Sequence, residues 1–231
     1  MREWAKRLEK RLRKIVPHGV QMASKACWNL ERKYGHWRSA WRRDSVDADG
    51  SPLPWYTYPA IEYLRQFDVS DWEMFEFGSG NSTLYWAGRC RQVTAVEDDP
   101  GWHQALLAKI PPNVTYLFET DPERYAAAVA RPGHSFDCIV IDGSARRRCA
   151  ETAPEFLKPG GLIILDNADW FPAAAAALRE SGLLEVDFHG FGPINGYSWT
   201  TSLFLSRDFS PKLAGDRQPL HSRAGICVVK D

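Results

Sequence analysis

One stretch constrains this chain more than any other: Met74-Phe75-Glu76-Phe77-Gly78-Ser79-Gly80-Asn81-Ser82-Thr83. A short apolar run contains an acidic residue near its end, two glycines follow one residue apart, and small polar residues then begin a helix. A strand, a glycine turn and a helix in this order bring the backbone close to a nucleotide-like ligand and direct helix N–H groups toward it. The stretch therefore predicts an α/β fold with a ligand site at this turn.

A second strand supports this interpretation. Residues 92–96, Gln-Val-Thr-Ala-Val, are predicted as a strand that leads into Glu97, nineteen residues after Gly78, with Asp98 beside it. A carboxylate about 20 residues after a glycine turn holds a ribose diol in doubly wound folds. We therefore expect Glu97 to bind the ribose of a nucleoside.

The glycine pattern also argues against a dinucleotide. A pyrophosphate-binding turn reads Gly-x-Gly-x-x-Gly, but Thr83 stands at the third glycine position. Glu76, just before the turn, would repel a diphosphate, whereas it suits a ligand that carries positive charge. A cationic nucleoside is the ligand that these residues favour.

Strand and helix patterns alternate from residue 73 onward. Apolar runs predict strands at 73–77, 92–97, 114–118, 136–141 and 161–165, with helices near 82–90, 100–109, 122–130 and 145–157 between them. Such alternation predicts a doubly wound sheet with right-handed crossovers. An Ala-rich helix at 172–180 precedes two strand-like runs, 183–188 and 200–206, which fit an antiparallel edge hairpin. Leu157-Lys158-Pro159-Gly160-Gly161 is interpreted as a helix exit with glycine at the C-cap.

Acidic residues end four of the predicted strands, at Glu76, Glu97, Asp142 and Asp166. Ligands of open α/β sheets bind at such strand ends, although acids there also serve as helix caps. Asp142, Asp166 and Asn167 end neighbouring strands, so their oxygens can converge on one Mg²⁺ ion. In the alternative, Asp166 and Asn167 cap a turn and Asp142 binds the amino group of the ligand.

The chain resembles the class I S-adenosylmethionine (SAM)-dependent methyltransferases over residues 55–206. The resemblance rests on the acid-x-Gly-x-Gly motif at Glu76 and on Leu-x-Pro-Gly-Gly at 157–161, with Ser82 where a third glycine is common. It implies a Rossmann-like fold with a doubly wound, mostly parallel seven-stranded sheet, and SAM as cofactor. The cofactor site would comprise Tyr58, Glu76, Gly78, Ser79, Gly80, Asn81, Ser82, Thr83, Glu97, Asp98 and Asp142.

Two further resemblances concern the reaction. The stretch Pro-Trp-Tyr-Thr-Tyr-Pro-Ala-Ile-Glu at 54–62 is similar to that of bacterial methyltransferases found with polysaccharide and glycolipid assembly, which implies methylation of a small-molecule or glycan hydroxyl. The acids at 142 and 166 with Asn167 resemble the Mg²⁺ site of catechol-type O-methyltransferases, except that Ala145 stands where that type has a lysine. An aminopropyl transferase and a catalytically silent SAM-binding fold are the alternatives.

Three residues are candidates for the catalytic step besides SAM binding. Asp142 would act there through the metal or by direct contact with the ligand, and His189 is a candidate general base, because it follows a strand-like run on the segment that closes over the pocket in the resembled fold. Arg146 begins a helix, where a cation is electrostatically disfavoured, so we expect it to hold an anionic group or a carboxylate. The alternative is a solvated basic face formed by Arg146, Arg147 and Arg148.

The first 45 residues differ from the domain expected at 46–231. Residues 1–43 carry thirteen Lys and Arg against three Asp and Glu, a net charge of +10 in a chain that is neutral overall. Basic helical segments, broken at Pro17-His18-Gly19, are predicted here, and residues 47–54 are predicted as a linker. These helices either bind an anionic membrane or pack on the acidic domain.

The composition also bears on location and partners. Five cysteines without paired spacing indicate no disulfide framework or zinc site, and no apolar run of 18 residues exists. We expect a cytoplasmic protein, peripheral at the inner membrane if the basic segment binds lipid. A nucleic acid partner is not expected, since the net charge is zero.

Overall fold

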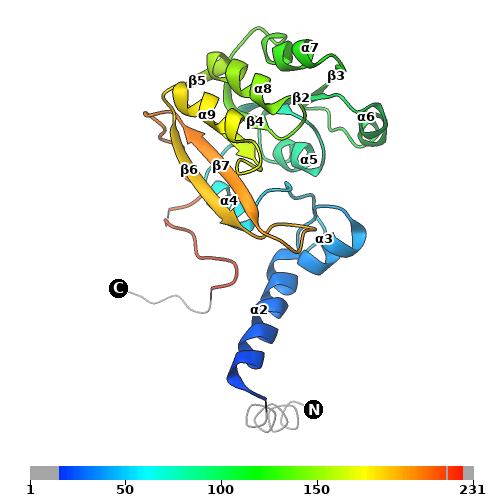
Figure 1. The fold of residues 1–231 in the computed structure, drawn as a ribbon, viewed down its shortest axis with the longest axis vertical. Helices are drawn as coiled ribbons and strands as arrows, with labels where there is room; N and C mark the ends of the chain where they lie inside the picture. The colour runs from blue at the N-terminus through cyan, green and yellow to red at the C-terminus, as the bar shows by residue number, and fades with distance from the viewer. Residues whose placement is uncertain (1–15, 217, 226–231) are drawn as a thin grey trace.

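The computed structural model describes residues 16–216 and 218–225. Seven strands form one sheet in the order β3-β2-β1-β4-β5-β7-β6 (Figure 1). Strands β1 to β5 pair in parallel, and β7 pairs antiparallel with both β5 and β6. The strands are β1 (Glu73–Phe77), β2 (Gln92–Glu97), β3 (Val114–Phe118), β4 (Phe136–Ile141), β5 (Leu157–Asp166), β6 (Leu184–Gly190) and β7 (Trp199–Leu205). The doubly wound sheet and the edge hairpin are confirmed.

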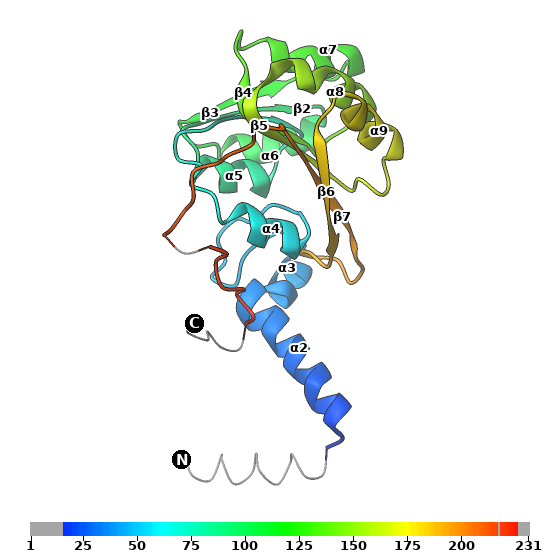
Figure 2. The same cartoon turned by 90° about the vertical axis from the view of Figure 1, so that its left-hand side faces the viewer.

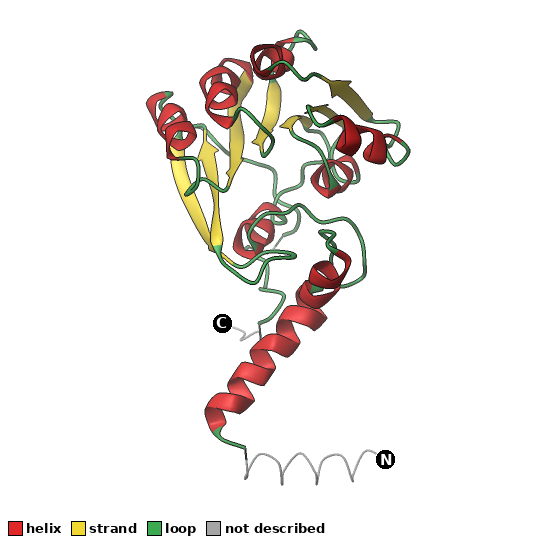
Figure 3. Ribbon diagram, turned by 45° about the vertical axis from the view of Figure 1, so that its right-hand side comes forward, coloured by secondary structure: helices red, strands yellow, loops and turns green. Residues whose placement is uncertain are grey.

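Helices cover both faces of this sheet (Figure 3). Alternate residues along the central strands enter two separate apolar cores, because successive side chains of a strand point to opposite faces. Phe75, Ile139 and Ile163 pack with α7 (Pro122–Ala126), the 3₁₀ helix η1 (Ala127–Ala130), α8 (Arg146–Thr152) and α9 (Pro172–Glu180). Their neighbours Met74 and Val140 pack on the other face with α4 (Tyr58–Leu64) and α5 (Asn81–Ala87). Helix α6 (Pro100–Leu107) links β2 to β3.

The helix exit predicted at residues 157–161 is wrong. Helix α8 ends at Thr152, a 3₁₀ helix η2 (Ala153–Phe156) follows, and the residues of the Leu-x-Pro-Gly-Gly stretch already belong to β5. Leu157 pairs with Phe136 before the register shifts, and Gly160 takes the positive φ of 76° that this irregular strand start requires. The glycines therefore serve a strand irregularity, whereas the prediction placed them at a helix end.

Among the described helices that precede the sheet, the first projects away from it and the second lies at the base of the first (Figures 1 and 2). Helix α2 (His18–Tyr34) and helix α3 (His36–Arg42) meet at Gly35, whose left-handed φ of 67° ends α2. Pro17 is the N-cap residue of α2, so His18 and Gly19 lie inside the helix and do not break it. The apolar spacing predicted for residues 4–15 lies outside the described residues.

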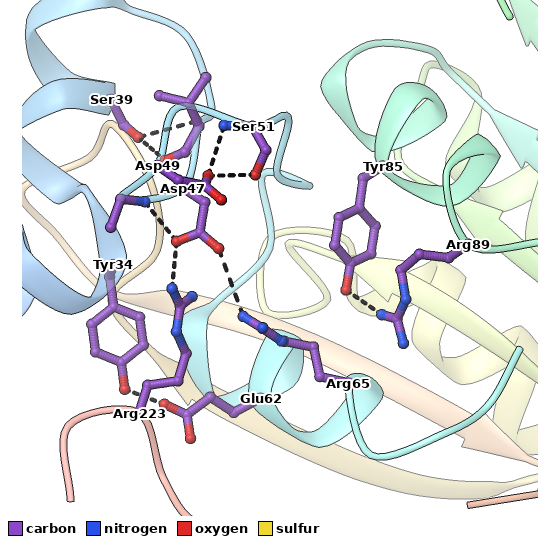
Figure 4. A network of polar contacts seen from close by, with 12 residues as sticks. Tyr34, Ser39, Asp47, Asp49, Ser51, Glu62, Arg65, Tyr85, Arg89 and Arg223 are labelled. Carbon is purple, nitrogen blue, oxygen red and sulfur yellow. Dashed lines mark hydrogen bonds and ion pairs between the residues drawn. The ribbon is translucent and has the colours of Figure 1, made fainter. Parts of the chain in front are cut away.

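Residues 47–54, expected as a linker, form a hydrogen-bonded turn against the domain. The Gly50 N–H donates to the Asp47 carbonyl at 2.9 Å, and Leu53 is buried. The Asp47 carboxylate lies between two arginines, Arg65 at 3.6 Å and Arg223 at 2.5 Å (Figure 4). This turn ties the projecting helices to α4 and to the C-terminal segment.

Two absences apply to the described part of the chain. No helix within residues 16–216 and 218–225 combines the length and the apolarity that crossing a bilayer requires. Cys27, Cys90, Cys138 and Cys149 are all unpaired, and only Cys27 is exposed. Cys227 lies outside the described residues.

Candidate functional site

The two glycines of the turn are required for different reasons. Gly78 has a φ of 95°, and a Cβ there would lie 2.9 Å from the backbone of Gly143, in the loop after β4. Gly80 has an extended backbone, and its Cβ would meet only the Trp102 ring, at 3.6 Å. Gly78 therefore serves the packing of two loops, whereas the protein itself leaves space for a side chain at residue 80.

The acid before the turn is held by the helix that follows it. Thr83 accepts a hydrogen bond from the Gly80 N–H at 3.0 Å and donates its hydroxyl proton to Glu76. The Glu76 side chain is buried, and its Oε1 has no hydrogen-bond partner. Burial raises the pKa of Glu76 to about 8, although hydrogen bonds from Ser82 and Thr83 oppose the rise. Thr83 thus closes the turn in place of a third glycine.

Glu97 ends β2 beneath the turn. Its Oε1 accepts the backbone N–H groups of Asp98 and Asp99, both at 3.0 Å, and its Oε2 accepts the Ser79 hydroxyl at 2.5 Å. The Ser79 hydroxyl also lies 2.8 Å from the Tyr116 hydroxyl. A ribose diol bound to Glu97 would therefore displace the Ser79 hydroxyl.

A cavity of about 440 Å³ lies beside the turn, at the carboxyl ends of the strands. Its polar floor contains Asp142 from the end of β4 and Asp166 from the end of β5, together with Arg146. Aromatic side chains form much of its wall, and Trp102 donates its indole N–H to the Ser79 carbonyl at 2.7 Å. The lining residues are Arg43, Asp44, Ser45, Trp55, Ser79, Gly80, Asn81, Ser82, Trp102, Ala105, Leu106, Lys109, Asp142, Arg146, Asp166, Asn167, Trp170, Ile194, Asn195 and Tyr197.

Arg146 organises the floor of this cavity. Its Nε–H donates to the Gly143 carbonyl at 2.9 Å, and its Nη1 donates to the Asp166 carbonyl and to Asn167 Oδ1. Its Nη2 donates to the Asp142 carbonyl at 2.9 Å and to Asp142 Oδ1 at 3.0 Å. All five guanidinium donors are therefore used, and the ring of Phe171 lies 4.4 Å from the guanidinium carbon. The expectation that Arg146 holds a carboxylate is confirmed.

The predicted metal ligands do not fit a divalent cation in this arrangement. The guanidinium of Arg146 lies between Asp142 Oδ1 and Asn167 Oδ1, where its charge would repel a metal ion. Asp166 Oδ1 is turned toward β7, where it accepts from Trp199 at 3.0 Å and from Thr201 at 2.5 Å. Among residues 16–216 and 218–225, no three His, Cys, Asp or Glu side chains are grouped to hold a metal.

Burial raises the pKa of both floor acids, whereas the neighbouring charges act on the two in different directions. Burial raises the pKa of Asp142 to about 6, and the charge of Arg146 limits that rise. Burial raises the pKa of Asp166 well above its usual range, and the neighbouring Asp142 charge raises it further. Asp142 is therefore the floor acid that is ionised near neutral pH.

Seven predicted site residues do not line the cavity: five of them, Glu76, Gly78, Thr83, Glu97 and Asp98, belong to the turn or its neighbourhood, and His189 and Tyr58 lie elsewhere. His189 is exposed on β6, where its Nδ1 lies 2.6 Å from Thr200 Oγ1, and it does not line the cavity. Tyr58 is buried, with its hydroxyl 3.2 Å from His36 Nδ1, on the side of α4 that faces Tyr34. In the aromatic stretch at residues 54–62, which includes Tyr58, it is Trp55 that lines the cavity.

Several wall residues were not among the sequence-based candidates. Arg43, Asp44 and Ser45 come from the end of the N-terminal segment, and Asn81 is held to it by hydrogen bonds to Asp44 Oδ1 at 2.6 Å and the Ser45 carbonyl at 2.7 Å. Trp102 comes from α6, and Ile194, Asn195 and Tyr197 come from the loop between β6 and β7. No local pattern in the sequence signalled these residues.

The comparisons with known proteins concern the fold. No family model and no curated protein matches the sequence. The structure is similar to the precorrin-6y C5,15-methyltransferase of Geobacter metallireducens, with a TM-score of 0.50 and 16% identity over 64% of this chain and 87% of that chain. Precorrin-8w decarboxylase of Methanobacterium thermoautotrophicum has a TM-score of 0.49 and 19% identity, over 71% and 97% of the two chains. NodS, an N-methyltransferase of Bradyrhizobium japonicum solved with S-adenosyl-L-homocysteine, has a TM-score of 0.47 and 16% identity, over 76% and 99%. The chain has the Rossmann-like methyltransferase fold.

Proposed function

We propose that this protein is a SAM-dependent methyltransferase that methylates a hydroxyl group of a small molecule or glycan. The observation that carries the proposal is the position of the cavity. The glycine turn, the acid at the end of β2 and a partly buried acid at the end of β4 lie at one edge of the sheet, around or next to this space. The name of the similar Geobacter structure, a methyltransferase, agrees with this assignment.

The chain offers a partner for each charged or polar part of the cofactor. Glu97 can accept both ribose hydroxyls once the Ser79 hydroxyl moves aside. Arg43 lines the cavity and forms no ion pair within the described residues, so it can meet the carboxylate of SAM. The unpartnered Oε1 of Glu76 favours a cationic group nearby. SAM supplies an electrophilic methyl group on its sulfonium.

Asp142 is the proposed proton acceptor. A base must be deprotonated at the working pH, and a pKa of about 6 meets that condition while keeping the carboxylate basic enough to accept a hydroxyl proton. Arg146 holds Oδ1, which leaves the other oxygen of this cavity-lining side chain for the acceptor. Holding the hydroxyl in line with the methyl group supplies much of the remaining catalysis. Mg²⁺ has no part in this proposal, because Arg146 occupies the ligands that it would need.

Calorimetric titration of the full chain with SAM, S-adenosylhomocysteine and decarboxylated SAM tests the cofactor assignment. SAM and S-adenosylhomocysteine should bind with one site per chain, and Glu97→Gln should weaken both. Decarboxylated SAM should bind more weakly, because it lacks the carboxylate that Arg43 would hold. Tighter binding of decarboxylated SAM would favour aminopropyl transfer, and no binding of any of the three would refute the proposal.

The reaction is tested with methyl-labelled SAM and fractionated small molecules and glycolipids. Label should move from SAM to an oxygen of one acceptor, and the Asp142→Asn protein should transfer it much more slowly while still binding SAM. Label on a nitrogen or carbon atom would contradict the choice of a hydroxyl.

A further inference from the structure

The N-terminal arm, defined here as residues 18–43 (α2, α3 and Arg43), carries large apolar side chains that the domain does not cover. Trp28 and Trp37 are each 61% exposed and Trp41 is 91% exposed, and helix α2 has no buried residue. Val20 and Met22 are exposed as well. Tryptophan is largely buried in most folded proteins, so three exposed rings in one short segment indicate a surface made for contact.

Positive charge accompanies these rings. The arm contains six basic side chains, Lys25, Arg32, Lys33, Arg38, Arg42 and Arg43, and none of them forms an ion pair within residues 16–216 and 218–225. Its single acid, Glu31, accepts the Trp37 backbone N–H at 2.7 Å. The Arg32 guanidinium lies over the Trp28 ring, 5.2 Å from its centroid. The arm therefore presents uncompensated cations next to exposed indoles.

Helical geometry places these groups on one side of α2. Lys25 and Arg32 lie three residues before and four residues after Trp28, and side chains at these spacings share a helix face. Leu30 and Tyr34 lie on the opposite side and pack toward the domain. The Tyr34 ring lies 4.6 Å from that of Tyr58. The Trp28 indole and the cations of Lys25 and Arg32 thus point away from the domain.

The base of the arm is held firmly, so this orientation is fixed. Tyr34 donates its hydroxyl to Glu62 of α4, and the Arg223 guanidinium lies 5.2 Å from the Tyr34 ring while pairing with Asp47 (Figure 4). From this base α2 extends away from the sheet (Figure 2). Helix α2 therefore contacts the domain near its C-terminal end, through Leu30 and Tyr34, and the rest of the helix projects from it.

We propose that the arm docks the protein on an anionic lipid bilayer. Tryptophan prefers the interface between headgroups and acyl chains, and lysine and arginine bind anionic headgroups while their stems lie along it. Nucleic acid is the weaker alternative, because the chain is neutral overall. A phosphate backbone also would not bury the exposed apolar side chains of Val20 and Met22. Since Arg43 ends the arm and lines the cavity, docking would bring the cavity close to the membrane surface.

Vesicle co-sedimentation of the full chain tests this proposal. The protein should pellet with vesicles of equal phosphatidylglycerol and phosphatidylcholine, less so at high salt, and not with phosphatidylcholine alone. Replacing Trp28, Trp37 and Trp41 together with alanine, or Lys25 and Arg32 with glutamate, should weaken pelleting at least fivefold. The Arg91→Glu/Arg147→Glu protein is the matched control, because it changes two exposed arginines outside the arm and should pellet like the wild type.

Three outcomes would overturn the proposal. The first is no pelleting with anionic vesicles, or pelleting that the arm and control variants change equally. The second is tighter binding to duplex DNA than to the vesicles. The third is a stable dimer in sedimentation velocity that the tryptophan variant dissolves, which would assign the rings to a second copy of the chain. SAM titration of the same proteins is independent of this result, so a failure here leaves the proposed function in place.

Discussion

Replacing Arg146 with alanine removes the group that holds the floor of the cavity together. The side chain is 10% exposed and forms its ion pair with Asp142, whose side chain is 21% exposed. Removing one partner of a buried pair costs about 3–5 kcal/mol, because the other charge is left without compensation. We expect the low end, about 3 kcal/mol, because Asp142 retains some contact with water. Urea unfolding followed by circular dichroism should detect this loss as a lower midpoint.

The cost should depend on pH in a definite direction. Burial raises the pKa of Asp142 and Arg146 lowers it, so the pKa rises further in the variant. A folded state with a raised carboxyl pKa loses stability as the pH increases from the unfolded value toward the folded one. The difference between wild type and variant should therefore be larger at pH 8 than at pH 5.

Arg147→Ala is the matched control for this measurement. Arg147 is the next residue of α8, is 71% exposed and pairs only with Glu151, so its loss should cost less than about 0.5 kcal/mol. If Arg146→Ala cost no more than the control, or if its cost were the same at both pH values, the assigned role of Arg146 would be refuted.

Three further predictions concern the site. Asp142→Asn should lower kcat by a factor of about 10²–10⁴ with little change in the Kd for SAM. The kcat of the wild type should decline below about pH 6, where Asp142 becomes protonated. A kcat that does not depend on pH would exclude Asp142 as the base. Burial raises the Glu76 pKa, so the wild type loses unfolding free energy as the pH rises from about 5 to about 8, and Glu76→Gln should lose less over this range. Parallel curves of unfolding free energy against pH for the two proteins would contradict this. Activity should be unchanged by EDTA, and a loss that Mg²⁺ restores would show that a metal displaces Arg146.

The sheet could be predicted from the sequence because its central strands are buried on both faces. Runs such as Cys138-Ile139-Val140-Ile141 are apolar throughout, and only central strands of a covered sheet require that. The acid at the end of each of four strands was equally visible, since a strand end and an acid are adjacent in the chain. The start of β5 was missed because proline and two glycines ordinarily punctuate a helix end, whereas here they shape an irregular strand start.

The wall of the cavity could not be predicted because it is made by segments far apart in the chain. Asn81 bonds to Asp44, 37 residues earlier, and no local spacing encodes that contact. The metal hypothesis followed from three oxygen ligands at neighbouring strand ends, but it missed that Arg146 binds Asp142 and Asn167 and that the Asp166 carboxylate turns toward β7. The position of Arg146 at a helix start predicted a bound anionic group or carboxylate, and the structure identifies that group as Asp142.

The central claim is that SAM binds at the glycine turn, and one titration tests it most directly. Gly80→Val places a side chain where SAM would lie, while the nearest protein atom to its Cβ, in Trp102, is 3.6 Å away. Calorimetry should show SAM binding to the wild type and none to Gly80→Val, although the two proteins unfold at the same temperature. Equal SAM affinity in both proteins would contradict the account.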